Sequence, residues 1–181
     1  MKRVISLWFP TLATDRLNCT KIDTKNEKLS KLSPPLVTVA TQHGSLKIVA
    51  ANHSANMQGI KPGLSLADSR ALSPDLVVRQ ANPAADVKAL NKLAQACERY
   101  SPWTAVDPSD SSGIWIDITG CTHLYNGERP LTQDLHDHCI QAGYQPRIGL
   151  ADTPGAAWAA ASFASATTKA AFAMSTLHCP K

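Results

Sequence analysis

Apolar runs alternate with helix-spaced segments along the first part of the chain. Val4–Phe9 is an apolar run closed by Pro10, which is typical of a buried strand, and Leu12–Leu17 then shows the spacing of a short helix. Leu36–Ala40 and Leu46–Ala51 are rich in residues that favour strands, and a glycine lies in the short segment between them. This pattern predicts a strand, a helix and a β-hairpin.

The middle of the chain predicts short helices followed by a long one. Ser54–Gln58 is a short helical stretch ended by Gly59, and Ser65–Leu72 starts with a serine cap. Asp86–Tyr100 is the clearest helix, because its apolar residues recur on one face. Those residues are Val87, Leu90, Leu93, Ala94 and Cys97.

The second half of the chain predicts two strands, a helix, a strand and a final helix. Together with the first strand, this order predicts a split β-α-β arrangement with helices on one face of a mainly antiparallel sheet, so the predicted fold class is α+β. The elements are strands Trp103–Val106 and Ile114–Thr119, joined by the turn Asp107–Gly113, helix Leu131–Ala142, strand Arg147–Ala151 and a helix from Pro154.

Composition and charge narrow the class of protein. The chain has 181 residues, of which 44% are hydrophobic and 18% charged, and its net charge of +4 permits a nucleic-acid surface without establishing one. Apolar stretches such as Ala156–Ala161 are too short to span a membrane. The five cysteines are scattered and form no C-x-x-C pair, so they indicate no disulfide framework. We expect a soluble protein of the reducing cytoplasm, with no membrane partner.

Four ordered blocks of sequence resemble a known family. Residues 51–76 read ANHSANMQGIKPGLSLADSRALSPDL and resemble the fingers segment of Y-family (UmuC/DinB-like) translesion DNA polymerases. The opening strand and helix Arg3–Leu17, the pair of segments 100–102 and 115–120, and the strand Arg147–Ala151 follow in that family's order. Within the family, residues 7–17, 115–121 and 151–159 are most similar to the ImuB-like branch.

The resemblance implies a division of the chain into subdomains. It implies a polymerase palm, a ferredoxin-like split β-α-β sheet, at residues 1–10 and 76–165, with a small fingers subdomain inserted at 11–75 and a tail at 166–181. The thumb and little-finger domains are expected to be absent. The clamp-binding peptide and the C-terminal partner-binding region of ImuB-like proteins are also expected to be missing.

The family's metal-binding positions carry no carboxylate in this chain. Two-metal phosphoryl transfer needs carboxylate oxygens in fixed positions, because Mg²⁺ is a hard cation. By resemblance these positions fall on Trp8, Ser112 and Gly113. The resemblance therefore implies no catalytic residue, no bound metal and no other cofactor.

The family's nucleotide-binding positions are substituted as well. The tyrosine and arginine of the fingers helix fall on His53 and Asn56, and a lysine of the last palm helix falls on Trp158. An asparagine cannot supply the guanidinium that binds phosphate in a bidentate manner. Trp8 and Trp158 are also candidates for lining a cleft, although core packing is the simpler interpretation of all four tryptophans, Trp103 and Trp115 included.

What the resemblance implies about function is an accessory role in SOS-induced translesion synthesis and DNA repair, without catalysis. The implied partners are a RecA-like ImuA-type protein, an error-prone replicative-type polymerase, the sliding clamp and, weakly, DNA. One alternative is an active template-dependent nucleotidyltransferase that uses Mg²⁺ and relocated carboxylates such as Asp107 and Asp110. We interpret both acids as exposed turn residues. Another alternative is a truncated relic without independent function.

Two further sets of residues are candidates for binding. Scattered cations could contact DNA phosphates, although a solvated loop is the simpler interpretation of the lysines. A Cys₂His₂ zinc site is a weaker alternative, because cysteine is often a small buried hydrophobe. The cations are Lys21, Lys25, Lys28, Lys31, Arg70, Arg79 and Arg147, and the zinc set is Cys121, His123, His136 and Cys139.

Overall fold

The computed structural model describes residues 2–19, 33–108, 112–163 and 171–172. Within these ranges the chain forms two compact units. Of the described residues, 2–10, 87–108, 112–163 and 171–172 belong to the first unit, and 11–19 and 33–86 belong to the second. Lys21, Lys25, Lys28, Lys31 and Asp110 lie outside the described residues.

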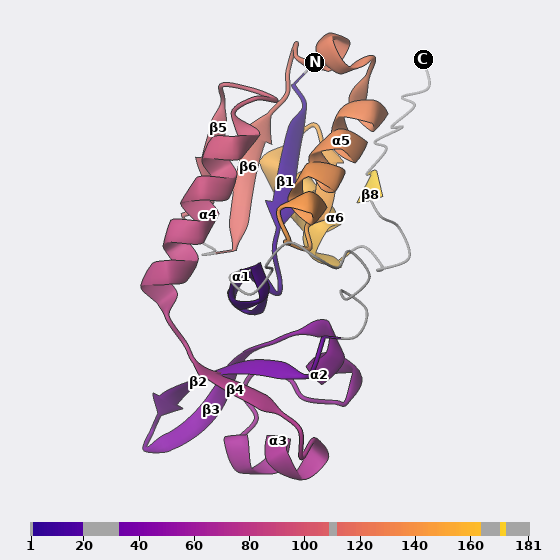
Figure 1. The fold of residues 1–181 in the computed structure, drawn as a ribbon. Coiled ribbons are helices and arrows are strands. Elements are labelled where there is room, and N and C mark those ends of the chain that lie inside the picture. Colours follow the sequence, from indigo (N-terminus) through magenta and orange to yellow (C-terminus); the bar gives the residue numbers. More distant parts are fainter. Residues whose placement is uncertain (1, 20–32, 109–111, 164–170, 173–181) are drawn as a thin grey trace, which may run out of the picture. The chain divides into compact units, whose positions relative to one another are not determined.

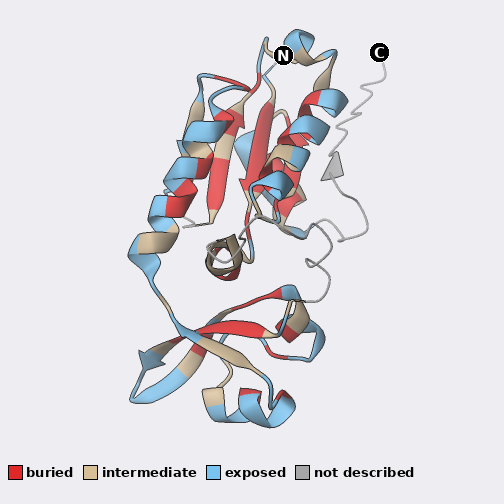
Figure 2. Cartoon of the chain, viewed as in Figure 1, coloured by how far each residue is buried: buried red, intermediate tan, exposed pale blue. Residues whose placement is uncertain are grey.

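The first unit is built on a sheet with the strand order β5-β6-β1-β7-β8. Strand β1 pairs antiparallel with both β6 and β7, and β8 pairs parallel with β7. Buried aliphatic side chains such as Ile5, Leu7 and Ile116 form the interior of the unit (Figure 2). Burial is continuous over the first four residues of β1. The strands are β1 (Val4–Trp8), β5 (Thr104–Val106), β6 (Gly113–Asp117), β7 (Arg147–Ala151) and β8 (Ala171–Phe172).

Helices cover both faces of this sheet. In Figure 1, α4 (Pro83–Cys97) and α5 (Glu128–Gln141) lie in front of the sheet, and α6 (Pro154–Phe163) lies behind it. A 3-10 helix, η1 (Thr122–Tyr125), precedes α5. The prediction of an α+β fold is confirmed, but the prediction that all helices share one face is wrong for α6.

A glycine explains why α6 packs on the second face. A Cβ atom at Gly149 of β7 would collide with the carbonyl oxygen of Ala157 and would lie 2.5 Å from the amide nitrogen of Ala161. The backbone of α6 therefore rests directly on β7, an approach that only glycine permits. Ala157 and Ala161 are buried in this contact.

The second unit contains a three-stranded sheet with the order β3-β2-β4. Strands β2 and β3 form the predicted hairpin, and His43 and Gly44 at its turn have φ angles of 50° and 76°. Two successive positive φ angles are typical of the tight turns that suit the twist of a hairpin. The elements of this unit are α1 (Leu12–Cys19), β2 (Leu36–Gln42), β3 (Ser45–Ala51), α2 (His53–Met57), α3 (Leu66–Leu72) and β4 (Val77–Gln80).

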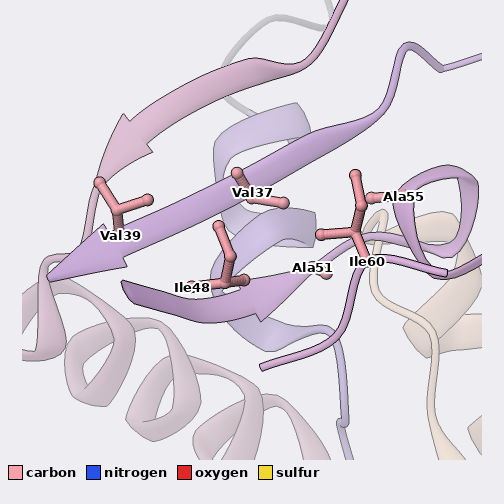
Figure 3. Packing of buried hydrophobic residues seen from close by; sticks show 6 residues of the cluster. All are labelled: Val37, Val39, Ile48, Ala51, Ala55 and Ile60. Carbon is pink, nitrogen blue, oxygen red and sulfur yellow. The ribbon is translucent and has the colours of Figure 1, made fainter. Parts of the chain in front are cut away.

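One face of this sheet packs against α2 and the turn that follows it. The buried cluster is drawn in Figure 3 and contains Val37, Val39, Ile48, Ala51, Ala55 and Ile60. Side chains cap the N-termini of α2 and α3. Asn52 Oδ1 accepts a hydrogen bond from the Ala55 amide at 2.9 Å, and Ser65 Oγ accepts one from the Asp68 amide at 3.1 Å. The predicted serine cap of α3 is thus confirmed.

Three details differ from the sequence analysis. Strand β4 was not predicted, and it pairs parallel with β2, so residues 77–80 pack within the second unit and the unit boundary lies after Asp86 rather than after Asp75. Val87 was expected on the buried face of the long helix but is 44% exposed.

In the described part of the chain, each helix falls short of the length and apolarity that crossing a membrane requires.

Candidate functional site

The end of β1 brings together the three positions at which the resemblance places metal ligands. Trp8 is in register with Gly113 on β6 and with Arg147 on β7. The Phe9 amide donates a hydrogen bond to the Ser112 carbonyl oxygen at 2.9 Å, which extends the pairing by one residue. Trp8, Ser112 and Gly113 thus lie at the same end of the sheet although the sequence separates them widely.

An aromatic ring and a cation occupy this end of the sheet. The guanidinium carbon of Arg147 lies 5.3 Å from the centre of the Trp8 ring, within the range of a cation–π interaction. Trp8 is half-buried. Arg147, a candidate DNA contact, is therefore engaged with Trp8 in this structure.

Asp107 lies beside Gly113 and is buried. Its amide donates to the Gly113 carbonyl oxygen at 2.9 Å, and the residue is only 6% exposed. A Cβ atom at Gly113 would lie 3.0 Å from Asp107 Cβ and 3.4 Å from its Oδ2 atom. The interpretation of Asp107 as an exposed turn residue is wrong, because its side chain fills the space beside Gly113. The alternation of β5 would have predicted exposure, since Ala105 on the same face is exposed.

Two other acids near the sheet have structural partners. Asp117 Oδ1 accepts a hydrogen bond from the Thr119 amide at 2.9 Å, and hydrogen bonding by the Thr119 side chain and amide lowers the pKa of Asp117. Asp152 accepts a bond from Arg3 Nη1 at 2.8 Å. Arg3 also makes a bidentate pair with Glu128, at 2.6 and 2.7 Å, which raises the Arg3 pKa. The sequence analysis did not predict this ion-pair group.

Two tryptophans of the first unit are exposed rather than packed in a core. Trp103 is 75% exposed and Trp158 is 37% exposed. The Trp158 ring meets the ring of Phe163 edge to face, with 5.6 Å between their centres. The interpretation of all four tryptophans as core residues is therefore wrong for these two.

The second unit carries the predicted nucleotide positions on a one-turn helix. His53 and Asn56 are both exposed on α2. Asn56 Nδ2 donates to the Ala51 carbonyl oxygen at 3.1 Å, so its side chain caps the preceding strand. Arg70 and Arg79 are exposed and are the candidate DNA contacts of this unit that the structure describes.

The zinc hypothesis does not fit the positions of its residues. Cys139 is buried against Cys97, whereas the Cys121 thiol donates to the Thr119 carbonyl oxygen at 3.9 Å. His136 Nδ1 lies 3.1 Å from an Asp137 carboxylate oxygen. Over residues 2–19, 33–108, 112–163 and 171–172, no group of three or more His, Cys, Asp or Glu side chains could hold a metal ion.

The fold is that of the N-terminal half of Y-family DNA polymerases of known structure. An insertion ternary complex of Dbh DNA polymerase matches with a TM-score of 0.74 and 14% identity over 94% of this chain and 48% of that one. DinB from Sulfolobus solfataricus matches with a TM-score of 0.69 and 15% identity over 94% and 48%. A Y-family DNA polymerase chimera of Dbh matches with a TM-score of 0.73 and 14% identity over 93% and 47%.

Sequence comparison gives the family. The model of the impB/mucB/samB family matches residues 20–162, so the chain belongs to this family. Protein ImuB of Caulobacter vibrioides, in strain NA1000 / CB15N and in strain ATCC 19089 / CIP 103742 / CB 15, is 46% identical over 105 residues. This match covers 58% of the chain and 22% of the relative, so the chain spans only part of the length of ImuB.

The residues at the end of β1 do not fit a pair of magnesium ions. Mg²⁺ is held by carboxylate oxygens in octahedral geometry. Trp8, Ser112 and Gly113 offer an indole, a hydroxyl and a hydrogen, and Asp107 is the one carboxylate described beside them. These side chains do not supply the set of oxygen ligands that two magnesium ions need.

Proposed function

We propose that this chain acts in translesion synthesis and DNA repair as a non-catalytic polymerase-like protein of ImuB type, or as part of one. The end of β1 carries this proposal. There, the positions expected to hold metal ligands carry Trp8, Ser112 and Gly113, and the Arg147 guanidinium lies against the Trp8 ring. The identity of 46% with Protein ImuB supports the choice of that branch.

The proposed loss of catalysis involves two requirements of phosphoryl transfer, the metal ligands and the cations that bind the phosphates. Phosphoryl transfer depends on metal ions that clamp the reacting oxygens and on cations that neutralise the phosphates. The first requirement fails at Trp8, Ser112 and Gly113. The second fails on α2, where the exposed residues His53 and Asn56 replace an aromatic and a cationic residue of the family, and on α6 at Trp158.

The partners of the chain are proposed by analogy with the family. We expect a RecA-like ImuA-type protein, an error-prone replicative-type polymerase and the sliding clamp.

DNA binding is expected to be weak and strongly dependent on salt, because phosphate contacts release counterions. A fluorescence titration of labelled primer–template DNA at several salt concentrations would measure it, with Arg70→Ala and Arg79→Ala each expected to weaken it modestly.

A primer-extension assay tests the absence of catalysis. The protein is incubated with primer–template DNA, all four deoxynucleoside triphosphates and either Mg²⁺ or Mn²⁺, beside an active Y-family polymerase as the positive control. We expect no extension above a protein-free reaction. Incorporation that survives repurification would contradict the proposal.

The position of Asp107 favours a second candidate function, a nucleotidyltransferase with a relocated carboxylate. This acid is buried beside Gly113, at the end of the sheet where the family's chemistry takes place. If extension is observed, Asp107→Asn removes the carboxylate charge at nearly constant volume. Activity abolished by Asp107→Asn and kept in the exposed-site variant Asp75→Asn would favour this enzyme.

A folded protein that neither extends primers nor captures the purified partners would favour a truncated relic without independent function.

A further inference from the structure

The sheet face of the first unit that lies opposite α4 and α5 is only partly covered (Figure 1). Helix α6 packs on this face over β7 and β1, where its backbone rests on Gly149. On β5, Ala105 is exposed, and Trp103, which directly precedes that strand, is 75% exposed. The β5 side of the face is therefore accessible to a ligand.

The strand register places three tryptophans in a line across this face. Trp115 of β6 is in register with Ala105 of β5 and with Ser6 of β1. Trp103 lies two residues before Ala105, and its carbonyl oxygen accepts a hydrogen bond from the last amide of β6 at 2.9 Å, so the pairing extends to it. Trp8 lies two residues after Ser6. Because residues two apart in a strand share a face, Trp8, Trp115 and Trp103 form a diagonal over three neighbouring strands, here called the tryptophan diagonal.

The tryptophan diagonal offers a series of flat surfaces. Neighbouring positions on such a diagonal are about 7–8 Å apart. Trp103 is exposed, and Trp8 and Trp115 are half-buried. At the Trp8 end, the Arg147 guanidinium lies against the ring. Unpaired bases stack on aromatic rings and on guanidinium planes, so this series of surfaces suits successive bases of a single strand.

The charges of this face suit the phosphates of the same ligand. Arg147 carries a positive charge at one end of the face, and the exposed Lys2 lies at the other end, close enough to Asp117 to attract its carboxylate. Asp117 is held by the Thr119 amide, and Asp107 is buried. A protein that covered the face with apolar side chains would bury both cations unpaired, which is costly. A polyanion with flat bases is therefore favoured over a protein as the occupant.

We propose that the tryptophan diagonal binds single-stranded DNA by stacking unpaired bases on its rings, with Arg147 and Lys2 contacting the phosphates. The inference rests on the proposed function, which places the chain at damaged DNA, and it names the form of DNA that this face binds. A duplex is the poorer ligand, because its bases already stack on one another and must be unstacked first.

Fluorescence anisotropy with three labelled probes tests the proposal on the whole chain. The probes are a single-stranded oligodeoxythymidylate, the corresponding duplex, and an abasic oligonucleotide of equal length that keeps the phosphates and lacks the bases. We expect the single strand to bind about tenfold more tightly than the abasic probe, and more tightly than the duplex. Equal affinity for the single strand and the abasic probe, or tighter binding of the duplex, would overturn the proposal. Failure of the single strand to bind would also overturn it, and would assign the face to a protein partner.

Replacing the exposed tryptophan tests stacking directly. We expect Trp103→Ala to weaken single-strand binding about tenfold and to leave the abasic probe unaffected, whereas Trp103→Phe keeps a ring and most of the affinity. Circular dichroism would check that both variants fold. Ile140→Ala is the matched control, because Ile140 is 43% exposed on α5, at the opposite face of the sheet, and its loss should leave binding unchanged.

The stacking proposal and the proposed function can fail separately. Primer extension by the unmodified chain would contradict the loss of catalysis and leave base stacking as it stands. Undiminished single-strand binding by Trp103→Ala would overturn base stacking and leave the proposed function as it stands.

Discussion

The two ends of strand β1 are held by opposite kinds of contact. Just before the strand, Arg3 is bound by two carboxylates, Glu128 at 2.6 Å and Asp152 at 2.8 Å. At the other end, Trp8 lies between Gly113 and Arg147, and a cation rests on an aromatic ring. The resemblance places the family's acids at the second end, on Trp8, Ser112 and Gly113. In this chain, the two acids described at the first end bind Arg3.

The two ends of β1 therefore differ in the role of their acidic residues. The ion pairs of Arg3 join the start of β1 to the start of α5 and to the residue that follows β7. They contribute to the stability of the sheet. The carboxylates expected at Trp8, Ser112 and Gly113 would repel one another without metal ions, so their loss costs the fold little.

The largest effect on stability is expected beside the middle of β1, where Ser6 is in register with Gly149 of β7. Gly149→Ala would place a methyl group against the backbone of α6, because its Cβ atom would collide with the Ala157 carbonyl oxygen. We expect the free energy of unfolding to fall by about 3 kcal/mol or more. Urea denaturation followed by circular dichroism would measure it.

Gly155→Ala is the matched control for this change. Gly155 lies in the first turn of α6, and a Cβ atom there would meet nothing within 4 Å. We expect Gly155→Ala to leave stability unchanged or to raise it slightly, because alanine favours a helix more than glycine does. Equal losses in both variants would show that α6 does not rest on β7 as described.

A smaller loss is expected at the start of β1. Arg3→Met keeps much of the side-chain length but leaves Glu128 and Asp152 without their shared cation. Because the Arg3 side chain is only 22% exposed, we expect a loss of about 1–2 kcal/mol, more than a surface ion pair gives. The exposed Lys88 on α4 gives the control Lys88→Met, and a loss in Arg3→Met no greater than in this control would contradict the assignment.

The next effect tests the end of β1. Gly113→Ala brings a Cβ atom to 3.0 Å from Asp107 Cβ, which is closer than ordinary packing. We expect a loss of about 1 kcal/mol, and a smaller loss when the same change is made in Asp107→Gly. A double-mutant cycle by urea denaturation measures this coupling. Additive losses would mean that Asp107 does not fill the space beside Gly113.

The sequence predicted most elements but not the contacts that join them. Apolar runs such as Val4–Phe9 predict buried strands well, because burial on both faces leaves a plain signal. Strand β4 was missed because it is short and ends in the exposed residues Arg79 and Gln80. The second face of the sheet was missed because a glycine in a strand does not by itself reveal which helix approaches it.

The residues of the candidate site could also be predicted only in part from the sequence. The resemblance named Trp8, Ser112 and Gly113, and the register of β1 and β6 brings them together. The group of Arg3, Glu128 and Asp152 was beyond prediction, because its members are 125 and 149 residues apart in the chain. The burial of Asp107 was equally beyond prediction, because Ala105 on the same face of β5 is exposed and only the pairing with β6 places Asp107 beside Gly113.

The smallest effect concerns Asp117, the last residue of β6, and depends on pH. Hydrogen bonds from the Thr119 side chain and amide lower the pKa of Asp117 in the folded protein. A lowered pKa means that these bonds stabilise the fold fully above the unfolded pKa of about 4, and that this contribution is lost as the pH falls through the folded pKa. Asp117→Asn should therefore cost about 0.5 kcal/mol at pH 7 and progressively less towards pH 2. Urea denaturation across this range would measure the difference, with Asp75→Asn as the exposed control, and a cost that grew as the pH fell would contradict the sign.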